Sequence, residues 1–302
     1  MICPNFLQEG DTVAIVSTAR KVLKRDLNPA INLLEQWGLK VILGESIEAE
    51  KNQFAGDDAL RTSDFQEMLD NSEVKAIWCA KGGYGTIRII DQLDFSEFIK
   101  HPKWIIGYSD ITVLHSHIHN LGVESLHAQM PVGIDLKTEA SRSSIKKVLF
   151  GEEYVVSIPS ERINKTGVVT GKLVGGNLSI LYSLCGSPSA INTDEKILFI
   201  EDLDEYLYHI DRMIQNLKRN GMFHKLKGLI VGGMTEMNDN EIPFGKTPEE
   251  MILEVCEEYD FPIAFNFPAG HVEDNRALIM GREVILEVKS KNVTLHINNS
   301  NN

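Results

Sequence analysis

The sequence has few cysteines, no long hydrophobic run and a deficit of positive charge. Its four cysteines (Cys3, Cys79, Cys185 and Cys256) are far apart and form no C-x-x-C pair, which argues against a metal site or a disulfide framework. No stretch approaches the roughly 18 apolar residues that cross a bilayer. The formal net charge of −13 disfavours nucleic acid and anionic membranes as partners, because both bind basic surfaces.

Residues 1–20 also lack the basic segment and the apolar run of a secretory signal. We therefore expect a cytoplasmic protein with reduced, buried thiols and with neither a metal nor a cofactor. What remains is an ordinary globular composition, with 43% hydrophobic and 24% charged residues. At 302 residues the chain exceeds the usual size of a single core, so we expect two domains.

The first half of the chain alternates apolar runs with segments of helical periodicity. Four apolar runs predict strands, at residues 12–16, 40–43, 76–80 and 104–106. Three segments between them carry apolar residues at helical spacing, at residues 26–37, 61–70 and 86–93. This alternation predicts an N-terminal α/β domain over residues 1–149, with a parallel sheet covered by helices on both faces.

The second half begins after a polar, irregular stretch, residues 150–166, which we interpret as a linker. Strands are predicted at residues 171–174, 197–200 and 228–231, helices at 178–185, 204–217 and 248–259, and a closing hairpin at 283–288 and 293–297. Asp204 is the expected N-cap of its helix. The pattern predicts a smaller C-terminal α/β domain over residues 167–302, with a mixed sheet.

Residues 104–112 read as a buried strand, a tight turn and the start of a helix. Ser109 lies at that turn, where a sharp bend exposes the hydroxyl and the next backbone N–H points into the same space, as in a nucleophile elbow. The second glycine of G-x-S-x-G is missing. The alternative is that Ser109 or Asp110 only caps the helix.

Two further strand ends carry an acid and a histidine. One apolar strand ends in Glu201 and Asp202, and His271 lies in a Pro/Gly loop after the apolar residues 263–265. Parallel α/β proteins place chemistry at such strand ends. A serine nucleophile needs a base, and the base needs an orienting acceptor. Because adjacent strand residues point to opposite faces, only one of the two acids can serve.

A glycine loop, Gly82-Gly83-Tyr84-Gly85, follows another predicted strand. Its backbone N–H groups could hold an anion, although neither common phosphate-loop motif is present. The alternative is a turn that needs only positive φ. His115 and His119 share a helix face, but Ser116 stands where H-E-x-x-H requires glutamate, so we favour packing over metal binding.

Five motifs occur in one order along the chain: Gly82-Gly83-Tyr84-Gly85, Gly107-Tyr108-Ser109-Asp110, Gly175-Gly176-Asn177-Leu178, Ile200-Glu201-Asp202 and Pro268-Ala269-Gly270-His271. Together they resemble the LD-carboxypeptidase family (peptidase S66), from about residue 10 to residue 281. This family includes muropeptide carboxypeptidases and microcin C immunity peptidases. The expected fold has a flavodoxin-like or amidotransferase-like parallel-sheet domain followed by the smaller mixed one.

The resemblance also assigns roles to site residues. It implies Ser109 as nucleophile, His271 as general base and then acid, and Glu201 rather than Asp202 as the orienting carboxylate. It further implies an oxyanion hole formed by the backbone N–H groups of Gly83 and Asp110. Tyr84 is the alternative to Gly83 as donor and a candidate substrate contact.

Arg212 lies in a helical segment that also resembles a family signature, and it is a second candidate substrate contact. An ion pair on the helix surface is the alternative role for this arginine. The stretch from His127 departs from the family's His-Gly-Pro-Met at Ala128 and Gln129, and we assign it no catalytic role.

The substrate follows from the resemblance alone. It implies release of a terminal D-alanine from cytoplasmic muropeptide tetrapeptides during peptidoglycan recycling. The immunity branch instead hydrolyses peptidyl-nucleotides and needs an aromatic platform for the base. Residues 168–197 contain no tryptophan, and Trp37, Trp78 and Trp104 fall in core elements, so we favour the muropeptide.

Two other classes of protein remain open. One is a non-catalytic α/β binding module. The other is a cysteine hydrolase with a similar first domain, although neither Cys79 nor Cys185 lies on an elbow. From family behaviour and the apolar surface around residues 115–118 we expect a homodimer that acts on a small peptide.

Overall fold

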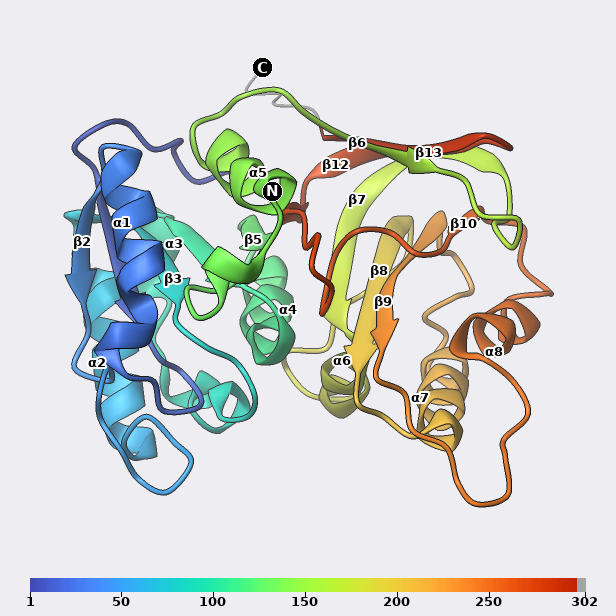
Figure 1. Ribbon diagram of the computed structural model, residues 1–302, viewed down its shortest axis with the longest axis horizontal. Helices are drawn as coiled ribbons and strands as arrows, with labels where there is room; N and C mark the ends of the chain where they lie inside the picture. Colours follow the sequence, from blue (N-terminus) through green and yellow to red (C-terminus); the bar gives the residue numbers. More distant parts are fainter. Residues whose placement is uncertain (298–302) are drawn as a thin grey trace.

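The structure is a computed structural model that describes residues 1–297, so residues 298–302 of the predicted second domain lie outside the described part. It contains two sheets side by side (Figure 1), which confirms the expected mixed α/β architecture. Among residues 1–297, no helix is long and apolar enough to cross a membrane.

The first sheet has six strands in the order β11-β5-β4-β3-β1-β2. Their bounds are Thr12–Val16 (β1), Lys40–Leu43 (β2), Val74–Cys79 (β3), Trp104–Gly107 (β4), Ser125–His127 (β5) and Leu278–Met280 (β11). Strands β1 to β5 are parallel, in the flavodoxin-like order 2-1-3-4-5. The last strand, β11, comes from the second half of the chain and pairs antiparallel with β5.

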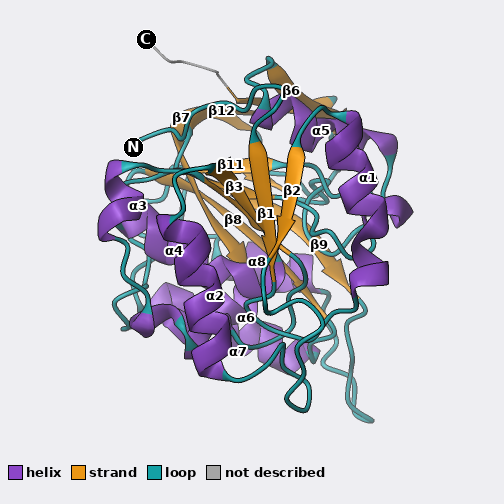
Figure 2. Ribbon diagram, turned by 90° about the vertical axis from the view of Figure 1, so that its left-hand side faces the viewer, coloured by secondary structure: helices purple, strands orange, loops and turns teal. Residues whose placement is uncertain are grey.

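Helices cover both faces of this sheet (Figure 2). Their bounds are Asn28–Gln36 (α1), Asp58–Asp70 (α2), Ser96–Lys100 (α3), Thr112–Asn120 (α4) and Glu139–Leu149 (α5). Residues of α1 and α5 pack with one face of the strands, and residues of α2, α3 and α4 pack with the other. The strands are buried on both faces, which explains why they read as continuous apolar runs.

The predicted helix at residues 86–93 is wrong. The structure has two 3₁₀ turns there, η2 (Thr86–Arg88) and η3 (Ile90–Gln92). Four β-branched residues in five positions lower the helix propensity of this stretch, and an N–H at its start bonds to a side chain, that of Asp110. Further 3₁₀ turns are Lys24–Leu27 (η1), Ser109–Ile111 (η4) and Ile134–Leu136 (η5).

The second sheet has seven strands in the order β10-β9-β8-β7-β12-β13-β6. Their bounds are Tyr154–Pro159 (β6), Gly167–Asn177 (β7), Lys196–Leu203 (β8), Gly228–Thr235 (β9), Ile263–Ala264 (β10), Glu283–Val288 (β12) and Asn292–Ile297 (β13). Strands β7 to β10 are parallel, and β12, β13 and β6 add antiparallel pairs. The sheet is mixed, as predicted, and it includes the expected hairpin of β12 and β13.

Three helices, Leu178–Leu184 (α6), Leu207–Arg219 (α7) and Pro248–Val255 (α8), pack on the parallel part of this sheet. Asp204 does not cap α7: the N-cap is Tyr206, and Asp204 lies in the preceding loop with φ of 55°. Residues 150–166, interpreted as a linker, contain β6, which forms the edge of the sheet beside β13.

The two sheets meet where α4 packs against β7, at the centre of the molecule in Figure 1. Gly176 permits this approach, because a Cβ atom there would lie 2.4 Å from Thr112 Oγ1. The same hydroxyl accepts a hydrogen bond from the Asn177 N–H at 2.9 Å. A buried ion pair between Glu124 and Arg282, at 2.6 Å, joins the two halves of the chain a second time.

Candidate active site

Ser109 lies on a strained turn directly after β4. Its φ is 62°, in the left-handed region that non-glycine residues rarely adopt. Gly107 keeps the turn compact, since a Cβ atom there would lie 2.8 Å from the Ile111 side chain. The start of α4 has no side-chain cap, so neither Ser109 nor Asp110 plays the capping role considered above. The geometry is that of an elbow that presents a hydroxyl.

Glu201 and His271 form a direct pair. Glu201 is fully buried at the end of β8, and its Oε2 accepts hydrogen bonds from His271 Nδ1 at 2.7 Å and from the His271 backbone N–H at 3.1 Å. Gly270 allows this contact, because a Cβ atom there would lie 2.6 Å from the same oxygen. The carboxylate therefore fixes both the position of the imidazole and the nitrogen that carries its proton.

Asp202, the rival of Glu201, points elsewhere. Its carboxylate accepts hydrogen bonds from the Asn177 side chain at 2.9 Å and from the backbone N–H groups of Ser179 and Leu203 at 2.8 and 2.9 Å. Burial, and secondarily the nearby Glu201 carboxylate, raises the pKa of Asp202 to about 7. Adjacent strand residues thus face opposite ways, and only Glu201 meets the histidine.

A cleft of about 560 Å³ between the two sheets brings Ser109 and His271 together. The Tyr108 ring packs on the imidazole, with ring centroids 4.7 Å apart. Within residues 1–297, Ser109 Oγ and the imidazole form no hydrogen bond with each other. A shared cleft with a hydroxyl, an imidazole and a buried carboxylate suits nucleophilic chemistry on a substrate bound between them.

The glycine loop and Asp110, the residue after Ser109, carry the two backbone N–H groups expected at the oxyanion. A Cβ atom at Gly82 would lie 3.3 Å from Ser109 Oγ, so the glycine loop lies directly beside the elbow. In the described part of the chain, neither the Gly83 N–H nor the Asp110 N–H donates to another group, and both residues line the cleft. The buried Asp110 carboxylate accepts from the Thr86 N–H at 2.9 Å and so ties the two loops together.

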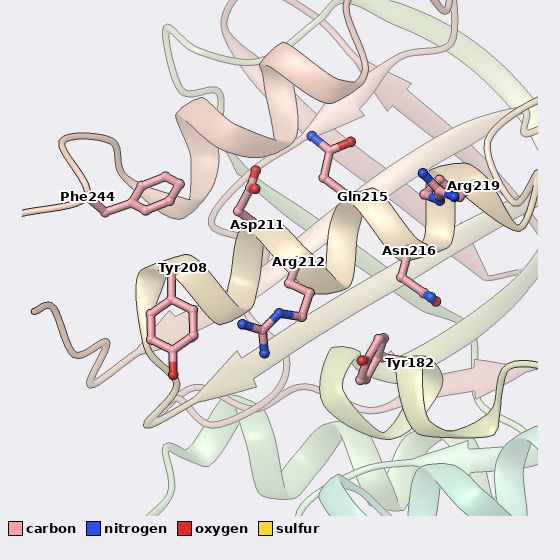
Figure 3. A pocket seen from close by; sticks show the side chains of 8 residues that line it. All are labelled: Tyr182, Tyr208, Asp211, Arg212, Gln215, Asn216, Arg219 and Phe244. Atoms are coloured by element: carbon pink, nitrogen blue, oxygen red, sulfur yellow. The ribbon is translucent and has the colours of Figure 1, made fainter.

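The two predicted substrate contacts do not line this cleft. Tyr84 is 44% exposed and packs against the Phe54 ring, with centroids 6.1 Å apart. Arg212 lies in a separate hollow on α7, where it points between Tyr208 and Tyr182 (Figure 3). Its guanidinium carbon is 5.2 Å from the centre of the Tyr208 ring. Arg212 lies on the side of α7 that faces away from the buried residues of the helix. The sequence alone could not show whether that side faces the cleft.

The histidines after Ser109 serve packing, as favoured. His115 is buried, with Nδ1 2.8 Å from Ser125 Oγ and Nε2 2.9 Å from the Gly107 carbonyl oxygen. Burial lowers its pKa to about 4. His127 is also fully buried, and its ring packs edge-on against the Tyr108 ring. Among the residues that the structure describes, no three His, Cys, Asp or Glu side chains are grouped to hold a metal ion.

The cleft also contains charged side chains to which the sequence assigned no role. Arg20 and Lys81 come from the loops after β1 and β3, and Asp204 and Glu205 come from the loop after β8. α/β sheets bind ligands just beyond the ends of their strands. The position of these residues after predicted strands is the signal in the sequence that could have indicated their place in the cleft.

Fold and site together define an α/β protein in which a strand-end serine and a histidine line one cleft, with a buried carboxylate behind the histidine, the arrangement of a hydrolase. Residues 13–128 match the family description LD-carboxypeptidase N-terminal domain, and residues 170–286 match LD-carboxypeptidase C-terminal domain. The chain belongs to this family, peptidase S66, as the five motifs predicted.

Relatives match almost the whole chain. A probable murein peptide carboxypeptidase of Bacillus subtilis is 35% identical, covering 97% of this chain and 93% of the relative. The microcin C7 self-immunity protein MccF of Escherichia coli is 26% identical, covering 96% and 94%. The crystal structure of muramoyltetrapeptide carboxypeptidase from Oxalobacter formigenes superposes with a TM-score of 0.87 at 27% identity, covering 95% of this chain and 98% of that one.

Proposed function

We propose that the protein is a serine carboxypeptidase that releases the terminal D-alanine from muropeptide tetrapeptides, with Ser109, His271 and Glu201 as its catalytic triad. The observation that carries this proposal is the 2.7 Å pair of His271 and the buried Glu201 in the cleft that Ser109 also lines. The relatives named murein carboxypeptidases support the substrate class.

In the proposed mechanism, Ser109 Oγ attacks the carbonyl carbon of the last peptide bond, and His271 Nε2 takes the hydroxyl proton. Glu201 accepts from Nδ1–H and stabilises the imidazolium that forms. The N–H groups of Gly83 and Asp110 donate to the tetrahedral oxyanion, each lowering the barrier by roughly 3 kcal/mol. His271 then gives its proton to the departing D-alanine amine, and water hydrolyses the acyl-enzyme by the same steps.

Several finer statements belong to the same proposal. We place the protein in the cytoplasm, where it would act in peptidoglycan recycling, and we propose that it works as a homodimer without a metal or a cofactor. We also propose residues 1–149 and 167–302 as its two domains, with β6 from the intervening residues 150–166 completing the second sheet and β11 from the second domain completing the first. Light scattering at micromolar concentration tests the dimer, and a monomeric mass would contradict it.

The decisive experiment is mass spectrometry of tetrapeptide and pentapeptide muropeptides after incubation with wild type and with Ser109→Ala. We expect the tetrapeptide to lose one alanine with the wild type only. A peptidyl-nucleotide of the microcin C type is the comparison substrate, and its faster hydrolysis would move the chain to the immunity branch. If neither substrate is cleaved and a fluorophosphonate probe fails to label Ser109, the protein is a binding module and the proposal is wrong.

A further inference from the structure

Apart from the buried Asp110 and Asp202, the charged side chains that line the cleft are segregated by sheet. The cations Arg20 and Lys81 follow strands of the first sheet, and the carboxylates Asp204 and Glu205 follow a strand of the second. Ser109 and His271 line the same cleft. A cleft with opposite charges on its two sides orients a ligand that carries opposite charges at its two ends.

The cationic side coincides with the point where the first sheet reverses its strand order. Strands β1 and β3 are neighbours, while β2 and β4 continue outward from them in opposite directions. Ligands of open α/β sheets bind beyond the carboxyl ends of the strands at such a switch point. Arg20 follows β1 and Lys81 follows β3, so the two cations occupy this position.

Arg20 lies directly against the glycine loop. A Cβ atom at Gly83 would lie 2.5 Å from Arg20 Nε and 2.6 Å from its Cδ, so the arginine stem packs on the Gly83 backbone. Within residues 1–297, neither Arg20 nor Lys81 forms an ion pair or a side-chain hydrogen bond, whereas Arg61 and Arg88 both pair with Asp58. In a chain of net charge −13, a guanidinium that has no carboxylate partner and lies against the glycine loop of the same cleft is available for an anion.

The two carboxylates of the anionic side, Asp204 and Glu205, are each positioned by a hydrogen bond to one of their oxygens. Glu205 Oε2 is 2.6 Å from His209 Nδ1, and Asp204 Oδ1 accepts from Asn238 Nδ2 at 2.9 Å. In the described part of the chain, the second oxygens of both carboxylates have no partner. His209 thus fixes the Glu205 carboxylate while one of its oxygens remains free for a cation.

We propose that Arg20 binds the terminal carboxylate of the substrate and that Glu205 binds the side-chain ammonium of the diamino acid before the scissile bond. This inference rests on the proposed function and assigns the residues that set its specificity. The terminal carboxylate lies one residue beyond the scissile carbonyl, about 3.8 Å farther along the chain. Because the Arg20 stem packs on Gly83, its guanidinium selects a carboxylate at that distance, which limits cleavage to one residue.

The experiment uses four variants and three synthetic peptides, and the diaminopimelate form of the parent peptide is tested with wild type in addition. The parent peptide is L-Ala-γ-D-Glu-L-Lys-D-Ala; the second peptide carries a C-terminal amide, and the third carries norleucine in place of lysine. Arg20→Gln is compared with Arg25→Gln, which removes the same charge at the surface, where the Arg25 side chain is 79% exposed beside Asp26. Glu205→Gln is compared with Glu35→Gln on the exposed side of α1.

With wild type, we expect kcat/KM for the amide and for the norleucine peptide to be about 10- to 100-fold lower than for the parent peptide. This is the range expected for the loss of one charge-assisted hydrogen bond. Arg20→Gln should lower the parent's kcat/KM by a similar factor, chiefly through KM, and should remove the preference for acid over amide. Glu205→Gln should remove only the preference for lysine over norleucine. Both surface controls should match wild type.

This pattern distinguishes the loss of one substrate contact from a general structural effect, because a structural effect would lower kcat/KM equally for all three peptides. If Arg20→Gln keeps the full preference for the free carboxylate, or Glu205→Gln keeps the full preference for lysine, the inference is wrong while the carboxypeptidase proposal stands. If wild type cleaves none of the peptides and the diaminopimelate form is equally inert, the carboxypeptidase proposal itself has failed.

Discussion

Replacing Gly270 by alanine should disable the site without changing any of the groups proposed to react. Gly270 has φ of 100°, and a Cβ atom there would lie 2.6 Å from Glu201 Oε2 and 2.7 Å from Glu201 Cβ. Glu201 is fully buried and its Oε2 is bonded twice to His271, so it cannot retreat without breaking that contact. The added methyl group must displace the carboxylate, the imidazole or both.

The expected loss of stability has two parts. A left-handed backbone costs an L-residue about 1–2 kcal/mol, and overpacking a tight interior costs about 1–3 kcal/mol more. Gly10→Ala is the matched control, because Gly10 has φ of 93° and no atom lies within 4 Å of the added Cβ. Gly270→Ala should therefore lower the free energy of unfolding by about 2–5 kcal/mol and Gly10→Ala by about 1–2 kcal/mol.

Urea unfolding followed by circular dichroism measures both values, and kcat/KM on the tetrapeptide measures the effect on activity. A displacement of about 1 Å in a positioned group lowers rates about 10²-fold, so Gly270→Ala should lose at least that factor while Gly10→Ala keeps wild-type activity. Equal destabilisation by the two variants, with activity intact in both, would refute the claim that Gly270 and His271 hold Glu201 between them.

Two further predictions concern buried groups away from the cleft. Burial lowers the pKa of His115 from 6.5 to about 4. As the pH falls from 6.5 to 4, this histidine is therefore protonated in the unfolded chain but stays neutral in the folded one. The free energy of unfolding should drop by about 3 kcal/mol over that window on account of this group, and urea titrations at several pH values should show a shallower drop in His115→Gln. Arg282→Met should cost about 3–5 kcal/mol, since it strands the buried Glu124 carboxylate, while Arg282→Met with Glu124→Met should recover most of that loss in thermal unfolding.

The elements that the sequence predicted are those whose pattern is local. The strand before Ser109 is a continuous apolar run, and the helix at Leu207–Arg219 repeats apolar residues at helical spacing, of which Ile210, Met213 and Leu217 are buried. The strands Ser125–His127 and Leu278–Met280 were not predicted. Each has only three residues, and their pairing joins segments about 150 residues apart, which no local pattern encodes.

The same distinction applies to the site. Ser109, Glu201 and His271 could be picked out because each ends or follows an apolar run, and because the motifs around them resemble the LD-carboxypeptidase family. Arg20 and Glu205 also follow strands, yet nothing local separates them from the many other charged loop residues. Only the strand order, which places the loop of Arg20 beside that of Lys81, shows which charges face the reaction.

The division of the site between the two sheets makes the contact between them part of the chemistry. Ser109 belongs to the first sheet, while Glu201 and the loop of His271 belong to the second, and the hydroxyl and the imidazole are not bonded to each other. Thr112, three residues after Ser109 in the chain, contacts Gly176 and Asn177 of the second sheet, so this contact helps to fix the separation of the hydroxyl and the imidazole. Proton transfer requires hydrogen-bond reach, so a small shift at this contact changes the rate much more than it changes stability. On the proposed mechanism, the close approach at Gly176 therefore serves the alignment of the hydroxyl with His271 as well as the packing of the two sheets.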